Sequence, residues 1–317
     1  MIICNYQFCL FIWYYFDTND MIIVKKLKRL PNKIKRKILQ FPILKFVSEF
    51  FYKKELKKYV NYLPKIYPED FTLIDSLRQE GVFVTYLQTL EISSTSLLIV
   101  SAKKLLPELL LLPSNGKYSI SLSSCILMNY PEIFLWGLEE RLINIVENYI
   151  GLPIMYHGVD FRREIANGKP INVRQWHIDI EDYRMVKIIV YLNNVSLNGG
   201  PFEYISKSLT SSLSQALKYS AGFVSDQVIE SFVAKSDWNS CVGQDGTVIF
   251  TDTCNVFHRA KPPVEADRFS LTFAYTSRQP ITMFTKSALH RDELQRISSK
   301  LNKRQRECIL GYRNSSY

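Results

Sequence analysis

Residues 173–205 read VRQWHIDIEDYRMVKIIVYLNNVSLNGGPFEYI, and this stretch decides the fold. It contains three short runs rich in apolar and β-branched residues, at 173–179, 185–192 and 202–205. The last two runs are separated by Asn198-Gly199-Gly200, a typical turn sequence. Short apolar runs divided by turn residues are typical of antiparallel strands, so the stretch predicts three of them.

The same pattern continues towards the C-terminus. Further strands are predicted at 248–251 and 269–276, and turns at Gly243-Gln244-Asp245-Gly246 and Pro262-Pro263. Many short strands at this spacing predict an antiparallel sandwich or jelly roll.

The N-terminal half shows helical periodicity instead. Helices are predicted at 31–62, 70–79, 97–112 and 133–150, with one strand at 82–85. The expected fold class is therefore mainly β with α, a jelly-roll core packed by helices from the N-terminal half. We expect this domain to cover residues 63–285, followed by a charged tail over 286–317 with helical periodicity.

The positive charge of the chain is concentrated in one segment. The whole chain has a net charge of +10, from 40 Lys and Arg against 30 Asp and Glu. Residues 21–60 hold 13 of the basic residues and only two acids, so the rest of the chain has a net charge of −1. The segment 21–62 is thus a basic helical element, either a solvated surface face or a contact with an anionic membrane or an acidic partner. The near-neutral body does not favour nucleic-acid binding.

Other features of composition exclude several classes of protein. With 47% hydrophobic and 22% charged residues, the chain is neither disordered nor collagen-like. No apolar run reaches the roughly 18 charge-free residues of a membrane-spanning helix. The six cysteines form no CxxC pair, which favours reduced thiols and a cytoplasmic location, with or without membrane association. Residues 1–20 lack the basic start of a secretory signal and fit either an upstream extension or a flexible start of the protein.

Two of the four histidines belong to a pattern that can bind a metal ion. His177 and Asp179 form a His-x-Asp pair in a predicted strand, where residues two apart face the same side. His258 follows the predicted strand 248–251 and a short turn. Two imidazoles and one carboxylate on one face of Fe(II) leave three positions open for a chelating cosubstrate and dioxygen. We therefore expect His177, Asp179 and His258 to be the metal ligands and the catalytic centre.

Further residues extend the pattern. Arg268 lies ten residues after His258, and its guanidinium can bind a carboxylate through two parallel hydrogen bonds. Ser270 shares the strand face with Arg268 and can donate another hydrogen bond. Lys187 either faces the mouth of the barrel, where it can assist a cosubstrate, or lies on the outer face of the sheet.

These motifs resemble the Fe(II)/2-oxoglutarate-dependent dioxygenases, and among them the phytanoyl-CoA dioxygenase family. The resemblance covers about residues 150–280 and rests on 176–182, 186–205, Phe257-His258 and Arg268-x-Ser270. It implies a double-stranded β-helix, a cupin-like jelly roll in which His177, Asp179 and His258 bind iron. It also implies that Arg268 binds the C5 carboxylate of 2-oxoglutarate, and we place Ser270 and Lys187 beside it as further cofactor contacts.

One departure from the family lies after the Gly-Pro strand. Family members often carry Gly-Ser-His there, whereas this chain has Ser206-Lys207-Ser208-Leu209-Thr210. This position is not among the metal ligands, so the departure concerns the substrate side of the site.

The resemblance implies an oxidoreductase. Such an enzyme would hydroxylate a small or lipid-like molecule with Fe(II), 2-oxoglutarate and dioxygen, and release succinate. Two alternatives remain open: a jelly roll that binds a ligand without catalysis, and a dioxygenase that acts on a macromolecular partner docked through the basic segment 21–62. Arg162 and Arg163 are either a solvated pair, the interpretation that we favour, or contacts to an anionic substrate.

Overall fold

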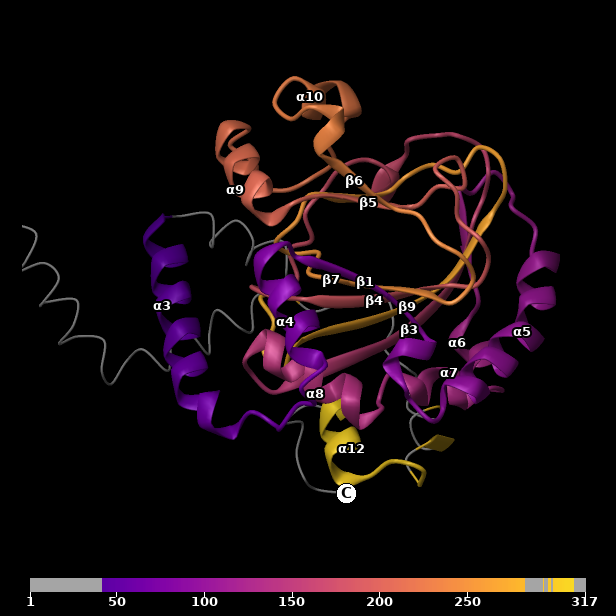
Figure 1. Cartoon of the computed structure of the whole chain (residues 1–317), viewed down its shortest axis with the longest axis horizontal. Helices are drawn as coiled ribbons and strands as arrows, with labels where there is room; N and C mark the ends of the chain where they lie inside the picture. The colour runs from indigo at the N-terminus through magenta and orange to yellow at the C-terminus, as the bar shows by residue number, and fades with distance from the viewer. Residues whose placement is uncertain (1–41, 283–292, 294–295, 298, 311–317) are drawn as a thin grey trace, which may run out of the picture.

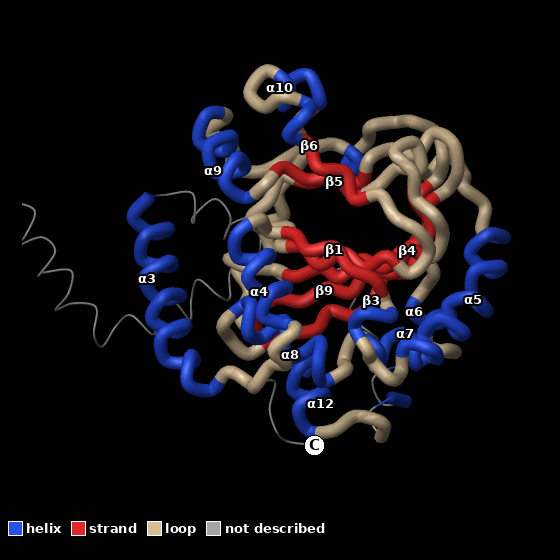
Figure 2. The backbone as a smooth tube through the Cα atoms, viewed as in Figure 1, coloured by secondary structure: helices blue, strands red, loops and turns tan. Residues whose placement is uncertain are grey.

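The computed structural model describes residues 42–282, 293, 296–297 and 299–310. Its strands are β1 (Val82–Tyr86), β2 (Ser119–Ser121), β3 (Ile154–Glu164), β4 (Val186–Tyr191), β5 (Phe202–Ile205), β6 (Trp238–Cys241), β7 (Thr247–Thr251), β8 (His258–Ala260) and β9 (Arg268–Ser277). In the described residues they form two antiparallel sheets, a larger one in the order β1-β7-β4-β9-β3-β2 and a smaller one in the order β6-β5-β8. The two sheets lie as separate layers (Figure 2). The predicted fold class, a mainly β jelly roll with helices, is confirmed.

Helices cover the outer faces of both sheets (Figure 1). Their bounds are α3 (Pro42–Tyr59), α4 (Asp70–Gln79), α5 (Thr95–Leu111), α6 (Ser124–Leu127), α7 (Pro131–Trp136), α8 (Glu140–Ile150), α9 (Lys207–Ala216), α10 (Asp226–Glu230) and α12 (Lys303–Leu310). Apolar residues of α4, α5, α7 and α8 pack with alternate residues of β3, β4, β7 and β9 to form the main core. A second cluster, which includes Trp176 and Phe257, joins α9 and α10 to the smaller sheet. Since both outer faces are covered, the inner faces are left to enclose a site.

Most predicted elements are confirmed, and two are wrong. The helix predicted at 133–150 is two helices, α7 and α8, because the chain turns between them. At this turn the carbonyl of Gly137 accepts a hydrogen bond from the hydroxyl of Tyr275 at 2.6 Å. The strand predicted at 173–179 is not regular: it begins with a 3-10 turn at Asn172–Arg174 and continues as extended chain held by single bridges.

Some elements escaped prediction, and some predictions fall outside the described residues. β3 and α9 were not predicted, although β3 is among the longest strands of the larger sheet. The basic segment 21–62 is described only from residue 42, where α3 begins, and residues 1–20 lie outside the described part. Of the tail 286–317, the helix α12 is described, and its Cys308 is fully buried.

Gly137 allows the turn between α7 and α8 to pack closely on the larger sheet. A Cβ atom at this position would lie 2.5 Å from the hydroxyl of Tyr156 and 2.8 Å from Cδ1 of Phe273, both buried in the main core. We therefore expect Gly137→Ala to lower the free energy of unfolding by about 1–3 kcal/mol, the usual cost of overpacking. Urea denaturation measures this change, and Gly116→Ala is a control for added β-carbon volume because nothing lies within 4 Å of its Cβ position, although its φ of +76° adds local strain of its own. A Gly137→Ala protein as stable as the wild type would contradict this packing.

No helix in the described residues is long and apolar enough to span a membrane. The four described cysteines are free thiols. Cys4 and Cys9 lie outside the described residues.

Candidate active site

The backbone holds His177 and His258 side by side. His177 N–H donates to the carbonyl of His258 at 3.0 Å, and His258 N–H donates back to the carbonyl of His177 at 2.9 Å. Two residues further on, Asp179 N–H donates to Thr253 O at 2.9 Å. This bridge connects the loop before β4 to the start of β8, so residues far apart in sequence present their side chains to one space.

The three predicted ligand atoms face one another. Nε2 of His177 lies 3.7 Å from Oδ1 of Asp179, and Nε2 of His258 lies 3.8 Å from Oδ2 of the same carboxylate. All three ligand atoms lie within 4.8 Å of one another. Three facial ligands about 2.1 Å from one metal ion are about 3 Å apart. Movements of roughly an ångström would therefore bring the three side chains onto a common ion.

Second hydrogen bonds orient both imidazoles. Nδ1 of His177 lies 2.9 Å from the carbonyl of Gln175, and Nδ1 of His258 lies 3.1 Å from the carbonyl of Val256. A carbonyl oxygen can only accept, so each Nδ1 carries the proton and each Nε2 keeps its lone pair for the site. This is the tautomer that a metal ligand needs.

The electrostatics of the site favour coordination. Burial lowers the pKa of the His177 imidazole and lowers that of His258 to about 3, so both stay neutral. Burial would raise the pKa of Asp179, but the neighbouring ammonium of Lys187 outweighs it, and the pKa of this carboxyl lies below its ordinary value. Two neutral imidazoles and one carboxylate are therefore present at neutral pH.

Lys187 points into the cavity and not to the outer face of the sheet. It lies on β4 between Val186 and Ile188, which belong to the main core on the other side. Its ammonium forms an ion pair with Oδ2 of Asp179. The structure thus places Lys187 beside the three candidate ligands.

Arg268 and Ser270 face the same cavity from β9. Both residues are buried, and both line the cavity. The guanidinium of Arg268 donates to the carbonyl of Gly200, while its Nε is buried without a hydrogen-bond partner among the described residues. A buried donor without a partner is uncommon and points to a missing acceptor. An anionic ligand beside Arg268 would supply one.

Gly200 is needed for this arrangement. Its φ is +74°, and a Cβ atom there would lie 2.6 Å from Lys261 O and 2.7 Å from Pro263 N. Only glycine fits so close an approach in this conformation. The Gly199-Gly200 turn of the sequence thus brings a carbonyl within reach of Arg268.

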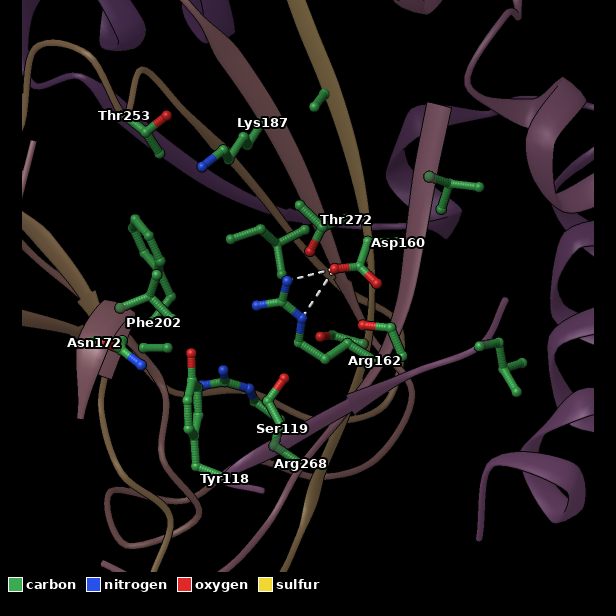
Figure 3. Close-up of a pocket in the computed structure, with 18 of the residues that line it drawn as sticks. Tyr118, Ser119, Asp160, Arg162, Asn172, Lys187, Phe202, Thr253, Arg268 and Thr272 are labelled. Atoms are coloured by element: carbon green, nitrogen blue, oxygen red, sulfur yellow. Dashed lines mark hydrogen bonds and ion pairs between the residues drawn. The ribbon is translucent and has the colours of Figure 1, made fainter. Parts of the chain in front are cut away.

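The cavity between the sheets has a volume of about 1220 Å³. It extends well beyond the three candidate ligands and reaches Ser119 and Ser121 on the edge strand β2. Figure 3 shows Arg162 between Lys187 and Arg268 in this view, with its contacts to Asp160 drawn as dashed lines. The space is large enough for a cosubstrate and a second small molecule.

A bulge in β3 brings Asp160 and Arg162 into this cavity. The pairing with β9 shifts by one residue between Tyr156 and Val159, where Gly158 has a φ of +94°. In a regular strand, residues an odd number apart face opposite sides, yet Tyr156 and Phe161 are five residues apart and both pack in the main core. The extra residue of the bulge therefore reverses which of the following side chains face the cavity.

The interpretation of Arg162 and Arg163 as a solvated pair is therefore wrong. Arg162 lines the cavity and pairs with Asp160, whereas Arg163 pairs with Asp267 at 2.6 Å and does not line the cavity. The alternation of residues along the strand could not reveal that Arg162 faces the cavity, because the bulge interrupts that alternation. Gly158 within an apolar run was the available signal.

No protein-family model matches the sequence, and no curated protein matches it significantly. Among solved structures, the chain is similar to EctD from S. alaskensis with 2-oxoglutarate and 5-hydroxyectoine, at 18% identity over 65% of this chain and 75% of that chain, with a TM-score of 0.47. It is also similar to HygX from Streptomyces hygroscopicus with nickel and 2-oxoglutarate bound, at 15% identity over 72% and 92% of the two chains, with a TM-score of 0.47. SnoN, a non-haem α-ketoglutarate-dependent epimerase from nogalamycin biosynthesis, shows 11% identity over 67% and 84%, with a TM-score of 0.40.

Proposed function

We propose that the protein is a non-haem Fe(II)- and 2-oxoglutarate-dependent dioxygenase that oxidises a small organic molecule. The observation that carries the proposal is the convergence of His177, Asp179 and His258 in one cavity with buried Arg268, whose Nε lacks an acceptor among the described residues. Within this superfamily, the motifs at 176–182 and 199–205 favour the phytanoyl-CoA dioxygenase family.

The residues fit the metal. Two neutral imidazoles and a carboxylate on one side of an ion form the facial set of non-haem Fe(II) oxygenases. His177, Asp179 and His258 would hold the iron, and the backbone bridge between the two histidines keeps their spacing. Burial raises the pKa of the nearby Cys254 thiol well above its ordinary value, so without a metal this cysteine is a neutral thiol.

The residues also fit the cosubstrate. Arg268 is buried at one wall of the cavity, with Ser270 beside it on the same strand face, and both would bind the distal carboxylate of 2-oxoglutarate. Lys187 lies next to Asp179 and would add a positive charge near the metal end. When bound, iron and 2-oxoglutarate supply oxidation of a C–H bond by dioxygen, coupled to decarboxylation of 2-oxoglutarate to succinate.

Aromatic side chains restrict water around the candidate ligands. The ring of Phe202 stacks on His258 with centroids 5.6 Å apart. The ring of Phe223 meets His177 edge-on at 5.3 Å. In a drier site the charged contacts of Asp179 and Arg268 are stronger than in bulk water, and side reactions with water are reduced.

A ligand-binding protein without catalysis is the alternative on the same fold. It would need neither a metal nor Arg268, so the intact ligand set weighs against it. Contact of the basic segment 21–62 with an anionic membrane or an acidic partner stays a prediction.

The proposed function predicts turnover without knowledge of the substrate. With Fe(II), 2-oxoglutarate and air, the purified protein should form succinate slowly, and replacing Fe(II) by Zn(II) should stop it. Under anaerobic conditions, Fe(II) and 2-oxoglutarate together should give a visible metal-to-ligand absorption band that neither gives alone. Absence of both the band and succinate, in protein shown to be folded, would exclude the proposed function.

A further inference from the structure

The cavity contains a second group of charged side chains, one strand beyond the candidate cosubstrate contacts. In the larger sheet β3 lies next to β9, and β2 follows at the edge. Asp160 is paired in register with Thr272, and Arg162 lies between Ser270 on one side and Ser121 on the other. These side chains line the cavity, but the metal and cosubstrate contacts described above do not use Asp160 or Arg162.

Asp160 and Arg162 form a partly exposed ion pair that keeps free hydrogen-bonding capacity. Nε of Arg162 donates to Oδ2 of Asp160 at 3.0 Å, and NH2 of Arg162 pairs with the same oxygen. Among the described residues, Oδ1 of Asp160 has no hydrogen-bond partner. The side chains of Arg162 and Asp160 are 28% and 29% exposed, and both residues line the cavity.

Arg162 is fixed from behind by a buried network. Its NH1 lies 3.5 Å from Oε1 of Glu164, whose other oxygen is 3.0 Å from the guanidinium of Arg174. The side chains of Glu164 and Arg174 are fully buried. Because this network is fixed, the cavity offers an acceptor on Asp160 beside donors on Arg162 in a set arrangement.

Hydroxyl groups surround the pair. Ser119 and Ser121 on β2, Ser123 and Ser124 before and in α6, and Thr272 on β9 all line the cavity. Apolar residues also line this end, among them Leu122 and Leu127. A wall of this kind has hydrogen-bonding groups next to apolar surface.

We infer that the Asp160–Arg162 pair binds the prime substrate of the proposed dioxygenase, and that this substrate is a small polyhydroxylated molecule. Neighbouring hydroxyls can each donate and accept, so one can donate to Oδ1 of Asp160 while the next accepts from Arg162. Ring or chain carbons of the same molecule would contact Leu122 and Leu127. That the bound molecule is a substrate rests on the proposed function. That a binding site exists here rests on the cavity alone.

An acyl chain fits this end of the cavity poorly. A chain lying across Asp160 and Arg162 would remove water from partly exposed charges without replacing its hydrogen bonds, which is unfavourable. A polyhydroxylated molecule replaces those hydrogen bonds. The structure thus favours a small polar substrate over a lipid-like one.

Ligand binding tests the inference without turnover. D-glucose, myo-inositol and decanoate would be titrated separately against the full chain loaded with Zn(II) and 2-oxoglutarate, with saturation-transfer NMR as the readout. We expect at least one of the two polyols to bind, and Asp160→Asn to weaken that binding about tenfold through loss of one charge-assisted hydrogen bond. Arg162→Gln should have a similar effect. Arg163→Gln is the matched control, because it removes a neighbouring arginine whose ion pair is outside the cavity.

The outcomes separate this inference from the proposed function. Failure of both polyols to bind, or binding that is unchanged in Asp160→Asn and Arg162→Gln, would overturn the inference. Binding of decanoate alone would also overturn it. Polyol binding that depends on Asp160 in a protein without iron-dependent succinate formation would support the site and refute only the proposed function.

Discussion

Asp179→Ala is expected to abolish iron-dependent succinate formation and to lower iron affinity by at least about a hundredfold. Loss of residues that merely support a ligand already costs 10- to 100-fold in metal affinity, and Asp179 would itself be a ligand. Lys187 should enlarge this loss of iron affinity, because in the wild type its ammonium pairs with the carboxylate of Asp179. In the variant an unpaired positive charge would face the position of a dication, next to two neutral imidazoles.

Calorimetric titration with Fe(II) under anaerobic conditions measures the affinity, and succinate release measures turnover. Asp75→Ala is a suitable control, because Asp75 is an exposed carboxylate that pairs with Arg78 on α4. His177→Ala should resemble Asp179→Ala in both measurements. A folded Asp179→Ala protein with full turnover would show that the iron mechanism is wrong.

Arg268→Lys is expected to weaken 2-oxoglutarate binding about ten- to a hundredfold with little change in iron affinity. Lysine keeps the positive charge but loses the planar pair of donors that matches a carboxylate. A charge-assisted hydrogen bond contributes roughly 1.5–3 kcal/mol, and each 1.4 kcal/mol is about tenfold in affinity. The iron should be unaffected, since Arg268 contacts the carbonyl of Gly200 and none of the candidate ligands.

Titration of the anaerobic Fe(II) protein, followed by the absorption band of chelated 2-oxoglutarate, measures both affinities. Arg163→Lys provides the control, as the neighbouring strand's arginine that pairs with Asp267 outside the cavity. If 2-oxoglutarate bound equally well to the wild type, Arg268→Lys and Arg268→Ala, Arg268 would have no part in the site. The main reason to name this cosubstrate would then be lost.

The sequence predicted correctly the elements in which regular alternation decides the side of the sheet that each residue faces, or in which a glycine marks the end of a helix. β5 and α4 have the predicted bounds, and α4 ends before Gly81, which has a φ of +81°. Alternation also explains why Arg268 and Ser270 share a face, since nothing interrupts β9. These features are local and depend on a few neighbouring residues.

It failed where distant contacts decide the conformation. Nothing near residue 137 shows that the hydroxyl of Tyr275 bonds its carbonyl or that Tyr156 leaves no room for a side chain. The segment 173–179 reads as a strand, yet it pairs only through single bridges, to Val224 and His258. The alignment of His177 with Asp179 was nonetheless predictable, because extended chain keeps the same period with or without a neighbouring strand.

The candidate ligands could be found from spacing, but the surroundings could not. Lys187 alternates with core residues along β4. Whether its side chain faces the cavity or the outside could not be predicted, because this depends on which face of the sheet the helices cover. Asp160 and Arg162 were hidden by the bulge that precedes them. The residues that we infer to bind the substrate thus depended on tertiary structure more than those expected to bind the metal.

The bulge at Gly158 also affects how mutations in this region act. Because the bulge already takes up one extra residue, an in-frame insertion of one further codon there would shift the alternation again, turning Phe161 towards the cavity and Asp160, Arg162 and Glu164 towards the apolar core. Such an allele would lose the fold, whereas a point mutation of Asp160 would keep the fold and change only what the cavity binds. In this strand, insertions of one residue would be removed by selection while changes of residue remain available for new specificities.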